Sequence, residues 1–372
     1  MRDSVDILKS AGAIAESVLA PSAEEIDRLA TYPTDGLTLL GEQGFWGLTI
    51  APEFGGLGAN LLTTTQVIEK LAEACPSTAM CFKMHLEAIN PMKELATKEQ
   101  ADLFLRPIAE GTLFAGVAAN EPGRGPGNIA SLAIQGQAGN FLLENCHKSF
   151  VTSAHFANIF SLLAKHDPET SDITSFLVNR ETPDCLVTVE NTWSGLGMRG
   201  NDSCAMTFSG SIPKSSLIDK VGGWRDIRSF HVPFVFITYA AVYLGIANGA
   251  FRHMIQGIRA RHNSPSNVSE VVRRHIGESR VMLEATRSLL YRSASKVDEG
   301  LSDLSLCMAS SVSADETALK VADTAMLLGG GGSYAKHTPV ERYLRDAYAG
   351  RIMVPQDEQT KLNLGTSSLD TV

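Results

Sequence analysis

The order of hydrophobic patterns along the chain constrains its fold more than any other feature. Apolar residues recur at helical spacing through about the first 100 residues, as at Ile7, Ala11 and Ile14. Short runs typical of β-strands follow from Gly111, and long helical patterns return from Val232 onward. A doubly wound fold alternates strands and helices throughout, so this order excludes it.

The β-type runs are short and are separated by glycine, proline and asparagine. They cover residues 114–118, 132–135, 141–143, 159–164, 174–178, 187–190 and 204–209. This spacing is typical of a small antiparallel barrel or sandwich. We therefore expect a mainly α-helical fold with a central β domain. The expected parts are an N-terminal helical domain in 1–112, a β domain in 113–220 and a C-terminal helical bundle in 221–372.

Charge and hydropathy exclude two classes of partner. The net charge is −9, whereas a general nucleic-acid binder carries a basic footprint. The most apolar long stretch, residues 232–246, is shorter than the ~20 residues that a membrane span needs. We therefore expect no nucleic-acid partner and no membrane span.

The six cysteines are scattered, without a Cys-x-x-Cys pair or zinc-type spacing beside histidine. Isolated cysteines of this kind are typical of buried, reduced thiols. The first residues have no apolar core behind a positive segment. The expectation is a cytoplasmic protein without a metal centre.

Four segments carry candidate binding residues. Residues 119–128 hold three glycines after an apolar strand, which free backbone N–H groups for a flat or anionic ligand; a plain hairpin loop explains them equally. In residues 148–153, Phe150 and Thr152 are two apart, a spacing that places both on one strand face, where they can stack on a ring and hydrogen-bond it.

Arg199 and Ser203 can hold an anion or belong to a surface turn. The glycines of 329–332 can cap a helix or approach a phosphate.

The order and distances of these segments resemble the acyl-CoA dehydrogenase family. The family's motifs T-E-P-x-x-G-S, K-x-W/F-I-T-N/S and G-x-R with a later hydroxyl correspond to residues 120–122, 148–153 and 197–203. Its glycine run and its P-V-E-R-x-x-R-D-A motif correspond to 329–332 and 339–347. A P-x-x-x-G-G-x-G loop at 52–58 and an S-T-A at 77–79 extend the match.

The resemblance implies FAD between the β domain and a four-helix bundle, in a homodimer or homotetramer whose neighbouring subunit completes the site. It places three residues of the first loop against the flavin ring, and Phe150 with Thr152 over it. Arg259 falls near an arginine that reaches the cofactor pyrophosphate across the dimer, although the phenylalanine and glycine that usually follow are missing. The implied cofactor-binding residues are Val117, Ala119, Asn120, Phe150, Thr152, Arg259, Met326, Gly329 and Gly330, and the implied substrate residues are Pro126, Arg199 and Ser203.

The sequence departs from the family where the catalytic glutamate belongs. That position is Val354, and the first bundle helix, where some members carry the glutamate, has no carboxylate in residues 234–239. Asp357 and Glu358 follow the vacant position and are candidate relocated bases, although an exposed loop pair explains them as well. His262 and Tyr348 are further candidates.

Two further departures lie in the first loop, where Asn120 replaces threonine and Pro126 stands where a serine often contacts the CoA side of the substrate. The chain therefore resembles the branch of specialised metabolism that oxidises hydroxyacyl or aminoacyl groups on acyl carrier proteins, as in polyketide extender-unit biosynthesis. The leading expectation is an FAD-dependent oxidoreductase of an acyl thioester, on a carrier protein rather than CoA. A two-component flavin monooxygenase and a non-catalytic relic are the alternatives. The acyl group and the electron acceptor stay open.

Overall fold

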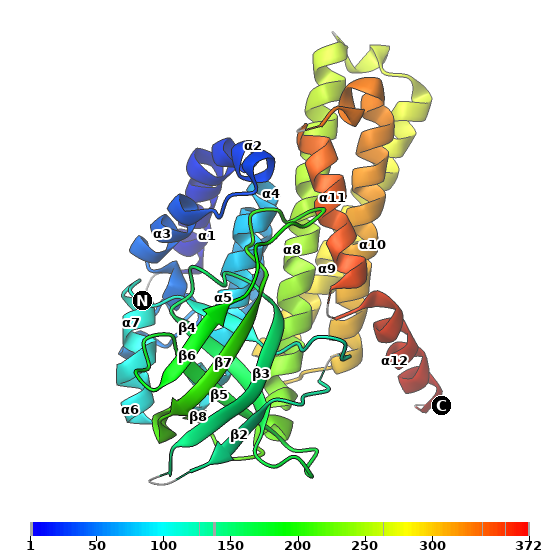
Figure 1. The fold of residues 1–372 in the computed structure, drawn as a ribbon. Coiled ribbons are helices and arrows are strands. Elements are labelled where there is room, and N and C mark those ends of the chain that lie inside the picture. The colour runs from blue at the N-terminus through cyan, green and yellow to red at the C-terminus, as the bar shows by residue number, and fades with distance from the viewer. Residues whose placement is uncertain are drawn as a thin grey trace.

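The computed structural model describes residues 3–125, 127–136, 139–262, 264–336, 338–353 and 355–370. An N-terminal group of helices and a central sheet lie on one side of a C-terminal bundle of long helices (Figure 1). The expected mainly α-helical fold with a central β domain is confirmed.

The N-terminal helices are amphipathic or fully buried. They are α1 (Ser4–Ile14), α2 (Ala20–Leu29), α3 (Thr34–Glu42), α4 (Leu61–Ala74), α5 (Pro76–Leu95), α6 (Lys98–Gln100) and α7 (Arg106–Ala109). Helix α4 begins where the Asn60 side chain accepts a hydrogen bond from the Thr63 N–H at 3.0 Å. The Asp298 carboxylate of the bundle accepts the Leu61 and Leu62 N–H groups at 2.7 and 2.9 Å. A negative charge at this helix start thus ties the N-terminal helices to the bundle.

The central domain is one eight-stranded, mostly antiparallel sheet. Its strands are β1 (Ala115–Ala118), β2 (Leu132–Gln135), β3 (Phe141–Val151), β4 (Ile159–Lys165), β5 (Ile173–Asn179), β6 (Cys185–Val189), β7 (Cys204–Ile212) and β8 (Leu217–Ile218). The path β6-β7-β3-β2-β4-β5-β8 leaves β1 to pair with β4. That pairing is parallel, which departs from the purely antiparallel sheet expected, because β1 enters from α7 rather than through a hairpin.

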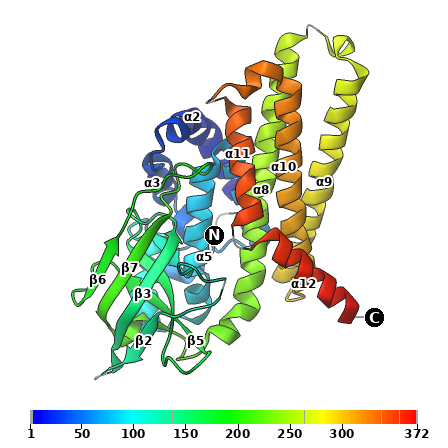
Figure 2. The ribbon, with the colours of Figure 1, turned by 45° about the vertical axis from the view of Figure 1, so that its right-hand side comes forward.

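The C-terminal part contains four long helices and a terminal one. They are α8 (Trp224–Arg261), α9 (Glu270–Asp298), α10 (Leu304–Gly329), α11 (Pro339–Ile352) and α12 (Asp357–Asp370). Helix α9 stands on the side of the bundle away from the sheet, and α12 projects outward from its lower end (Figure 2).

Helix α8 is long and apolar enough to cross a membrane by length and composition alone. In the folded protein 83% of its most apolar window is buried, because α4, α5 and α10 surround it. A helix that is apolar all round is typical of a protein core, so packing accounts for its composition.

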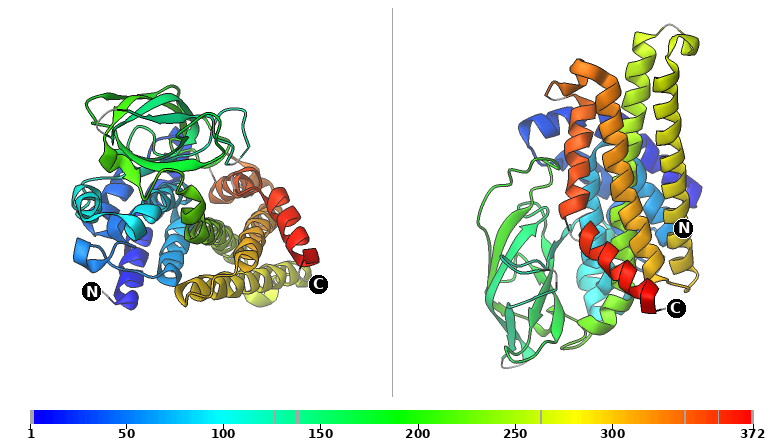
Figure 3. Two further views of the ribbon diagram at one scale, coloured as in Figure 1. Left: turned by 90° about the horizontal axis from the view of Figure 1, so that it is seen from below. Right: turned by 90° about the vertical axis from the view of Figure 1, so that its right-hand side faces the viewer.

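The turn between α10 and α11 carries the glycine run, as the 3₁₀ segment Gly330–Tyr334. This turn lies at the end of the bundle that is farther from the sheet (Figures 1 and 3). One protomer therefore does not bring the glycine run to the strands that carry Phe150 and Val117.

Candidate active site

His85 positions the strand that leads into the first candidate loop. Its Nε2–H donates to the Trp46 carbonyl and its Nδ1 accepts the Ala115 N–H, both at 2.9 Å. The ring stacks on Phe114 with centroids 4.4 Å apart. Burial disfavours the charged imidazolium and lowers the pKa of His85 to about 4, so the neutral ring serves both bonds. The start of β1 is thus held by a fully buried side chain of α5.

The residues expected to line the flavin ring lie at the exposed edge of this strand and just after it. Val117, Ala119 and Asn120 are half-buried, whereas the neighbouring Ala118 is buried. The Asn120 carbonyl accepts the Ser149 N–H at 2.9 Å, which joins the first loop to the end of β3. The structure therefore brings together the first and second candidate segments.

A buried ion pair also joins the first loop to β3. Lys148 Nζ lies 2.6 Å from Glu121 Oε1 and donates to the Leu163 carbonyl at 2.7 Å. Glu121 also accepts the Ala130 and Ser131 N–H groups. Burial alone would raise the pKa of Glu121, but the Lys148 ammonium outweighs it and the net direction is downward. These two motif residues are therefore structural supports of the candidate site.

The spacing of Phe150 and Thr152 predicted that both lie on one face of a strand, but in the structure they do not. Strand β3 ends at Val151, a register shift occurs between Lys148 and Val151, and Phe150 has a φ of +56°. Phe150 is 66% exposed, whereas Thr152 is 5% exposed and its Oγ1 lies 2.9 Å from Ser203 Oγ. The bulge breaks the alternation on which the expectation rested. Thr152 and Ser203 are nevertheless paired, and Phe150 presents a free aromatic face.

The third segment packs onto α2 and α11. Arg199 Nε donates to the Asp27 carbonyl at 2.6 Å and lies 3.8 Å from its carboxylate. The Met198 N–H donates to Asp346 Oδ1 at 2.6 Å. A Cβ on Gly197 would lie 2.4 Å from the Arg345 carbonyl oxygen, so only glycine fits there. Arg199 thus contacts the N-terminal helix α2, and its expected role at the substrate stays a prediction.

The terminal motif on α11 ties the three parts of the chain together. The Arg345 guanidinium donates to both Asp27 carboxylate oxygens, at 2.5 and 2.9 Å, and to Glu341. It also donates to the Leu196 carbonyl at 2.9 Å. A planar fork of donors suits such carboxylate contacts. Within this chain the Arg345 contacts therefore serve the packing between α11, α2 and the 193–203 loop.

Arg259 does not lie beside the glycine run. Arg261, two residues further along α8, donates to the Leu328 and Gly329 carbonyls at 2.8 and 3.0 Å. Arg259 instead lines a cavity of about 630 Å³ between α4, α8 and α9. Two residues along a helix differ by ~200° in direction, so Arg259 and Arg261 face different sides of α8. Arg261 is the arginine that contacts this turn within the protomer, and the expected contact of Arg259 with a cofactor phosphate across the dimer stays a prediction.

The glycine run presents open backbone. Apart from the adjacent residues in the chain, no atom of the described residues lies within 4 Å of a Cβ built on Gly330, Gly331 or Gly332. Gly330 has a φ of +65°, which favours glycine. Ser333 Oγ closes the turn on the Met326 carbonyl at 2.7 Å, so Met326 and Gly329 contribute to its fold. The surface is free for contact with another molecule.

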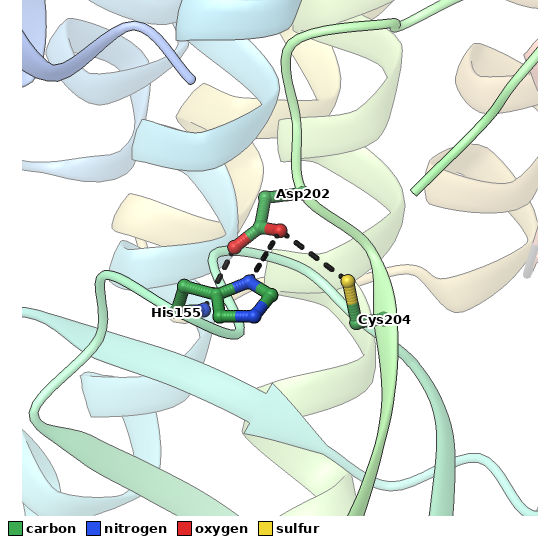
Figure 4. Close-up of side chains that lie close together, drawn as sticks. All are labelled: His155, Asp202 and Cys204. Carbon is green, nitrogen blue, oxygen red and sulfur yellow. Dashed lines mark hydrogen bonds and ion pairs between the residues drawn. The ribbon is translucent and has the colours of Figure 1, made fainter. Parts of the chain in front are cut away.

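His155, Asp202 and Cys204 form a cluster at the end of the 193–203 loop (Figure 4). Their possible ligand atoms lie within 4.8 Å of one another. The His155 N–H and ring and the Cys204 thiol all contact the Asp202 carboxylate, at 2.7 to 3.3 Å. Burial raises the pKa of Cys204 to about 12, whereas a metal ligand is a thiolate. The contacts describe a hydrogen-bonded turn centred on Asp202.

Comparison with known proteins covers all three parts of the chain. Models of the acyl-CoA dehydrogenase N-terminal, middle and C-terminal domains match residues 2–112, 116–211 and 222–366. The chain belongs to the acyl-CoA dehydrogenase family. It is 26% identical to an acyl-CoA dehydrogenase of Bacillus subtilis, over 94% of this chain and 93% of that protein. It is 28% identical to the cyclohex-1-ene-1-carbonyl-CoA dehydrogenase of Geobacter metallireducens, over 96% and 95%.

Solved structures share the acyl-CoA dehydrogenase fold over the whole chain. Butyryl-CoA dehydrogenase from Megasphaera elsdenii has a TM-score of 0.92 at 24% identity, covering 99% of both chains. PigA, solved with FAD, has a TM-score of 0.89 at 23% identity, covering 99% of this chain and 97% of its own. The prolyl acyl carrier protein oxidase AnaB reaches 0.88 at 20%, covering 98% of both. The chain is accordingly an acyl-CoA dehydrogenase-type oxidoreductase, as the sequence predicted.

The family's usual base position, Val354, lies outside the described residues, as does Pro126. Of the relocated-base candidates, Asp357 is 2% exposed and burial raises its pKa, as it does for the facing Asp315. The Glu358 side chain is 80% exposed and lies 3.3 Å from Lys361. Glu358 is thus a solvated residue, while Asp357 points into the bundle.

The remaining base candidates lie at the surface. Tyr348 is 47% exposed and lines a cavity of about 330 Å³ with Asp357, Arg351 and Lys320. His262 follows the last residue of α8 at the far end of the bundle. Among the described candidates, Asp357 is therefore the one held inside the protein.

Sequence reasoning missed a charged pair inside the protein. Lys83 and Glu87 lie one helical turn apart on α5, and both are buried against Tyr239 of α8. Their i, i+4 spacing was visible in the sequence, but it is equally typical of a solvated helix face. Only the packing of α5 against α8 shows that the pair is inside.

Proposed function

We propose that this protein binds FAD and oxidises a short acyl thioester, carried by an acyl carrier protein rather than by CoA. The supporting observation is that residues expected to face the flavin are accessible in the structure, while the sequence lacks the family's catalytic glutamate. Val354 and residues 234–239 offer no carboxylate, yet the half-buried edge at Val117 and the exposed ring of Phe150 are in place.

The residues present fit a flavin. Phe150 offers an exposed aromatic face for a flat ring, and Thr152 and Ser203 offer hydroxyls beside it. The open glycine run and Arg261 fit an anionic phosphate contributed from a second copy. When bound, FAD accepts a hydride from the substrate. PigA, a structural neighbour, was solved with FAD.

Two hydrogens must leave the substrate, one as hydride and one as a proton. The proton requires a base at the substrate carbon or hydroxyl, and such a base typically contributes ~10²–10⁴-fold in rate. Asp357 is the buried carboxyl group that follows the vacant position, and burial raises its pKa above the ordinary value of an aspartate, which favours a proton acceptor. Asp357 therefore takes this role in the proposal, with Asp315 holding its orientation.

A carrier-protein substrate agrees with the departures from the β-oxidation pattern at Asn120, Pro126 and Val354. AnaB, named a prolyl acyl carrier protein oxidase, shares the fold. All six cysteines are free and buried, which agrees with a reducing compartment such as the cytoplasm.

The purified protein should show flavin absorbance, and an acyl thioester should bleach it under anaerobic conditions. Hydroxyacyl or aminoacyl groups loaded on a carrier protein are expected to act, and butyryl-CoA or octanoyl-CoA to act poorly. Rapid bleaching by butyryl-CoA would contradict the proposed preference for a functionalised acyl group on a carrier protein.

A two-component monooxygenase is the second candidate function. It is favoured by the absent glutamate, since oxygen chemistry does not require it, and the dibenzothiophene monooxygenase TdsC shares the fold with a TM-score of 0.88. In that case no thioester would bleach the flavin, and substrate conversion would need a separate reductase and oxygen.

A further inference from the structure

Lys83 is buried between α5 and α8 with an incomplete set of partners. Its side chain has no exposed surface and pairs with Glu87, one turn along α5. Its ammonium lies 3.1 Å from the centroid of the Tyr239 ring. Glu87 and Tyr239 are 8% and 9% exposed, so both keep a small exposed surface that Lys83 lacks.

The Lys83 ammonium has three N–H donors, and one strong hydrogen-bond acceptor lies beside it. Glu87 Oε2 takes one donor, while the other contacts are Met84 Sδ at 3.7 Å and the face of Tyr239. A thioether sulfur is a weak acceptor, and a ring face gives directionless attraction. The Tyr239 hydroxyl also lies against Met84 Sδ, at 3.3 Å. Two of the three donors of Lys83 therefore face only weak acceptors.

Stability alone does not explain the pair. A buried ion pair rarely stabilises more than well-packed apolar residues of the same volume. Burial lowers the pKa of Lys83 to about 8 against the opposing pull of Glu87, which shows that the ammonium is held at a cost. Costs of this kind concentrate at functional sites.

The cluster connects to the segment that follows α11. Tyr239 and Tyr243 are one turn apart on α8, a rise of ~6 Å. The Tyr243 hydroxyl lies 4.0 Å from Met353 Sδ, next to the vacant base position. Lys83, Tyr239, Tyr243 and Met353 thus form a continuous row from α5 to the loop expected at the reacting atoms.

We propose that Lys83, with Glu87 and Tyr239, forms the polar end of the acyl site and accepts a short acyl group with a hydroxyl or carboxylate oxygen at its distal end. This assignment rests on the proposed function, because it needs an acyl thioester in the site. The oxygen would complete the donor set of Lys83, whereas an alkyl end would leave those donors unpaired. Such a site rejects the alkyl analogue because unpaired buried donors are costly.

The test is a flavin difference-spectrum titration of the holoenzyme with two acyl groups of equal size, 3-hydroxypropionyl and butyryl, each presented both on CoA and on an acyl carrier protein. The wild type is expected to bind the hydroxylated thioester at least ~10-fold more tightly. Lys83→Met should reduce this preference to about twofold or less, since it removes the donors and keeps the length. Malonyl-CoA should behave as the hydroxylated thioester does.

Lys83→Met leaves the Glu87 carboxylate without its partner and is open to misfolding. The double variant Lys83→Met, Glu87→Gln removes both charges together, so it keeps the test valid. Lys93→Met is the matched control on the same helix, since Lys93 pairs with its neighbour Glu94 nearer the surface. It should retain the wild-type preference.

The outcomes separate this inference from the proposed function. Equal affinity of the wild type for both thioesters, or an unchanged preference in the double variant, overturns the Lys83 assignment and leaves thioester binding intact. Absence of any spectral change with all three CoA thioesters and with the carrier-protein thioesters overturns the proposed function, and the Lys83 assignment with it.

Discussion

Lys148 and Glu121 form a buried ion pair that joins the two segments expected to face the flavin. The ammonium lies 2.6 Å from the carboxylate, and both side chains are at most 5% exposed. Lys148 lies on β3, two residues before Phe150, and Glu121 directly follows Asn120. One contact deep in the sheet thus sets the distance between the loop and the aromatic residue.

Lys148→Met is expected to destabilise the protein by ~3–5 kcal/mol, because it leaves a buried carboxylate without its partner. Flavin retention should fall with it, since the two segments lose their common support. The double variant Lys148→Met, Glu121→Gln should recover part of the loss. Urea unfolding and the flavin-to-protein ratio measure both effects, and simple additivity of the two single variants would argue against the coupling.

His85 should make stability pH-dependent. Its pKa falls from 6.5 to about 4 on folding, so the unfolded chain takes up the proton first as the pH drops. The stabilisation from neutral His85 is therefore complete above pH 6.5 and is lost as the pH falls towards 4. The free-energy difference between wild type and His85→Gln should shrink by up to ~1.4 kcal/mol per pH unit in this window. A difference that stays constant from pH 7 to pH 4.5 would contradict the neutral-ring assignment.

Gly331→Val tests whether a second copy approaches the glycine run. Apart from the adjacent residues in the chain, a Cβ at Gly331 meets no atom of the described residues, and Gly331 avoids the positive φ that would strain the same change at Gly330. We expect normal helical content with reduced flavin retention. Circular dichroism, light scattering and the flavin-to-protein ratio are the measurements. Gly12→Val, in open space on α1, is the matched control, and full occupancy in Gly331→Val would remove the run from the cofactor site.

Asp357 and Glu358 provide a matched pair of neighbouring carboxylates. Asp357→Asn should lower the rate of flavin reduction by ~10²-fold or more if it accepts the substrate proton. Glu358→Gln should leave the rate within about twofold, because an exposed side chain held by Lys361 does not reach the interior. Stopped-flow reduction across pH measures both. Unchanged rates in both variants would favour the monooxygenase.

Parts of the candidate site were predictable because their signals are local. The glycine-rich loop, the glycine run and the α11 motif carry their residue types at short spacings, so their order identified the family. The contacts that these segments make in the folded protein were not predictable from the sequence. Phe150 and Thr152 were expected on one face, and a bulge in β3 separates them. The contact of Arg199 with Asp27 was not predicted, because the two residues are distant in the sequence.

The sequence by itself determined the helix–sheet–helix order, since the periods of apolar residues depend only on local backbone geometry. It also determined the loss of the family's glutamate at Val354. The tertiary structure decided which charges are buried. The spacing of Lys83 and Glu87 is equally typical of a solvated helix face, and only the packing of α5 against α8 buries the pair. The structure also shows that Arg261 contacts the start of the glycine run. The burial of a side chain and the neighbours that it contacts depend on how segments far apart in the chain pack. No local sequence pattern carries that information.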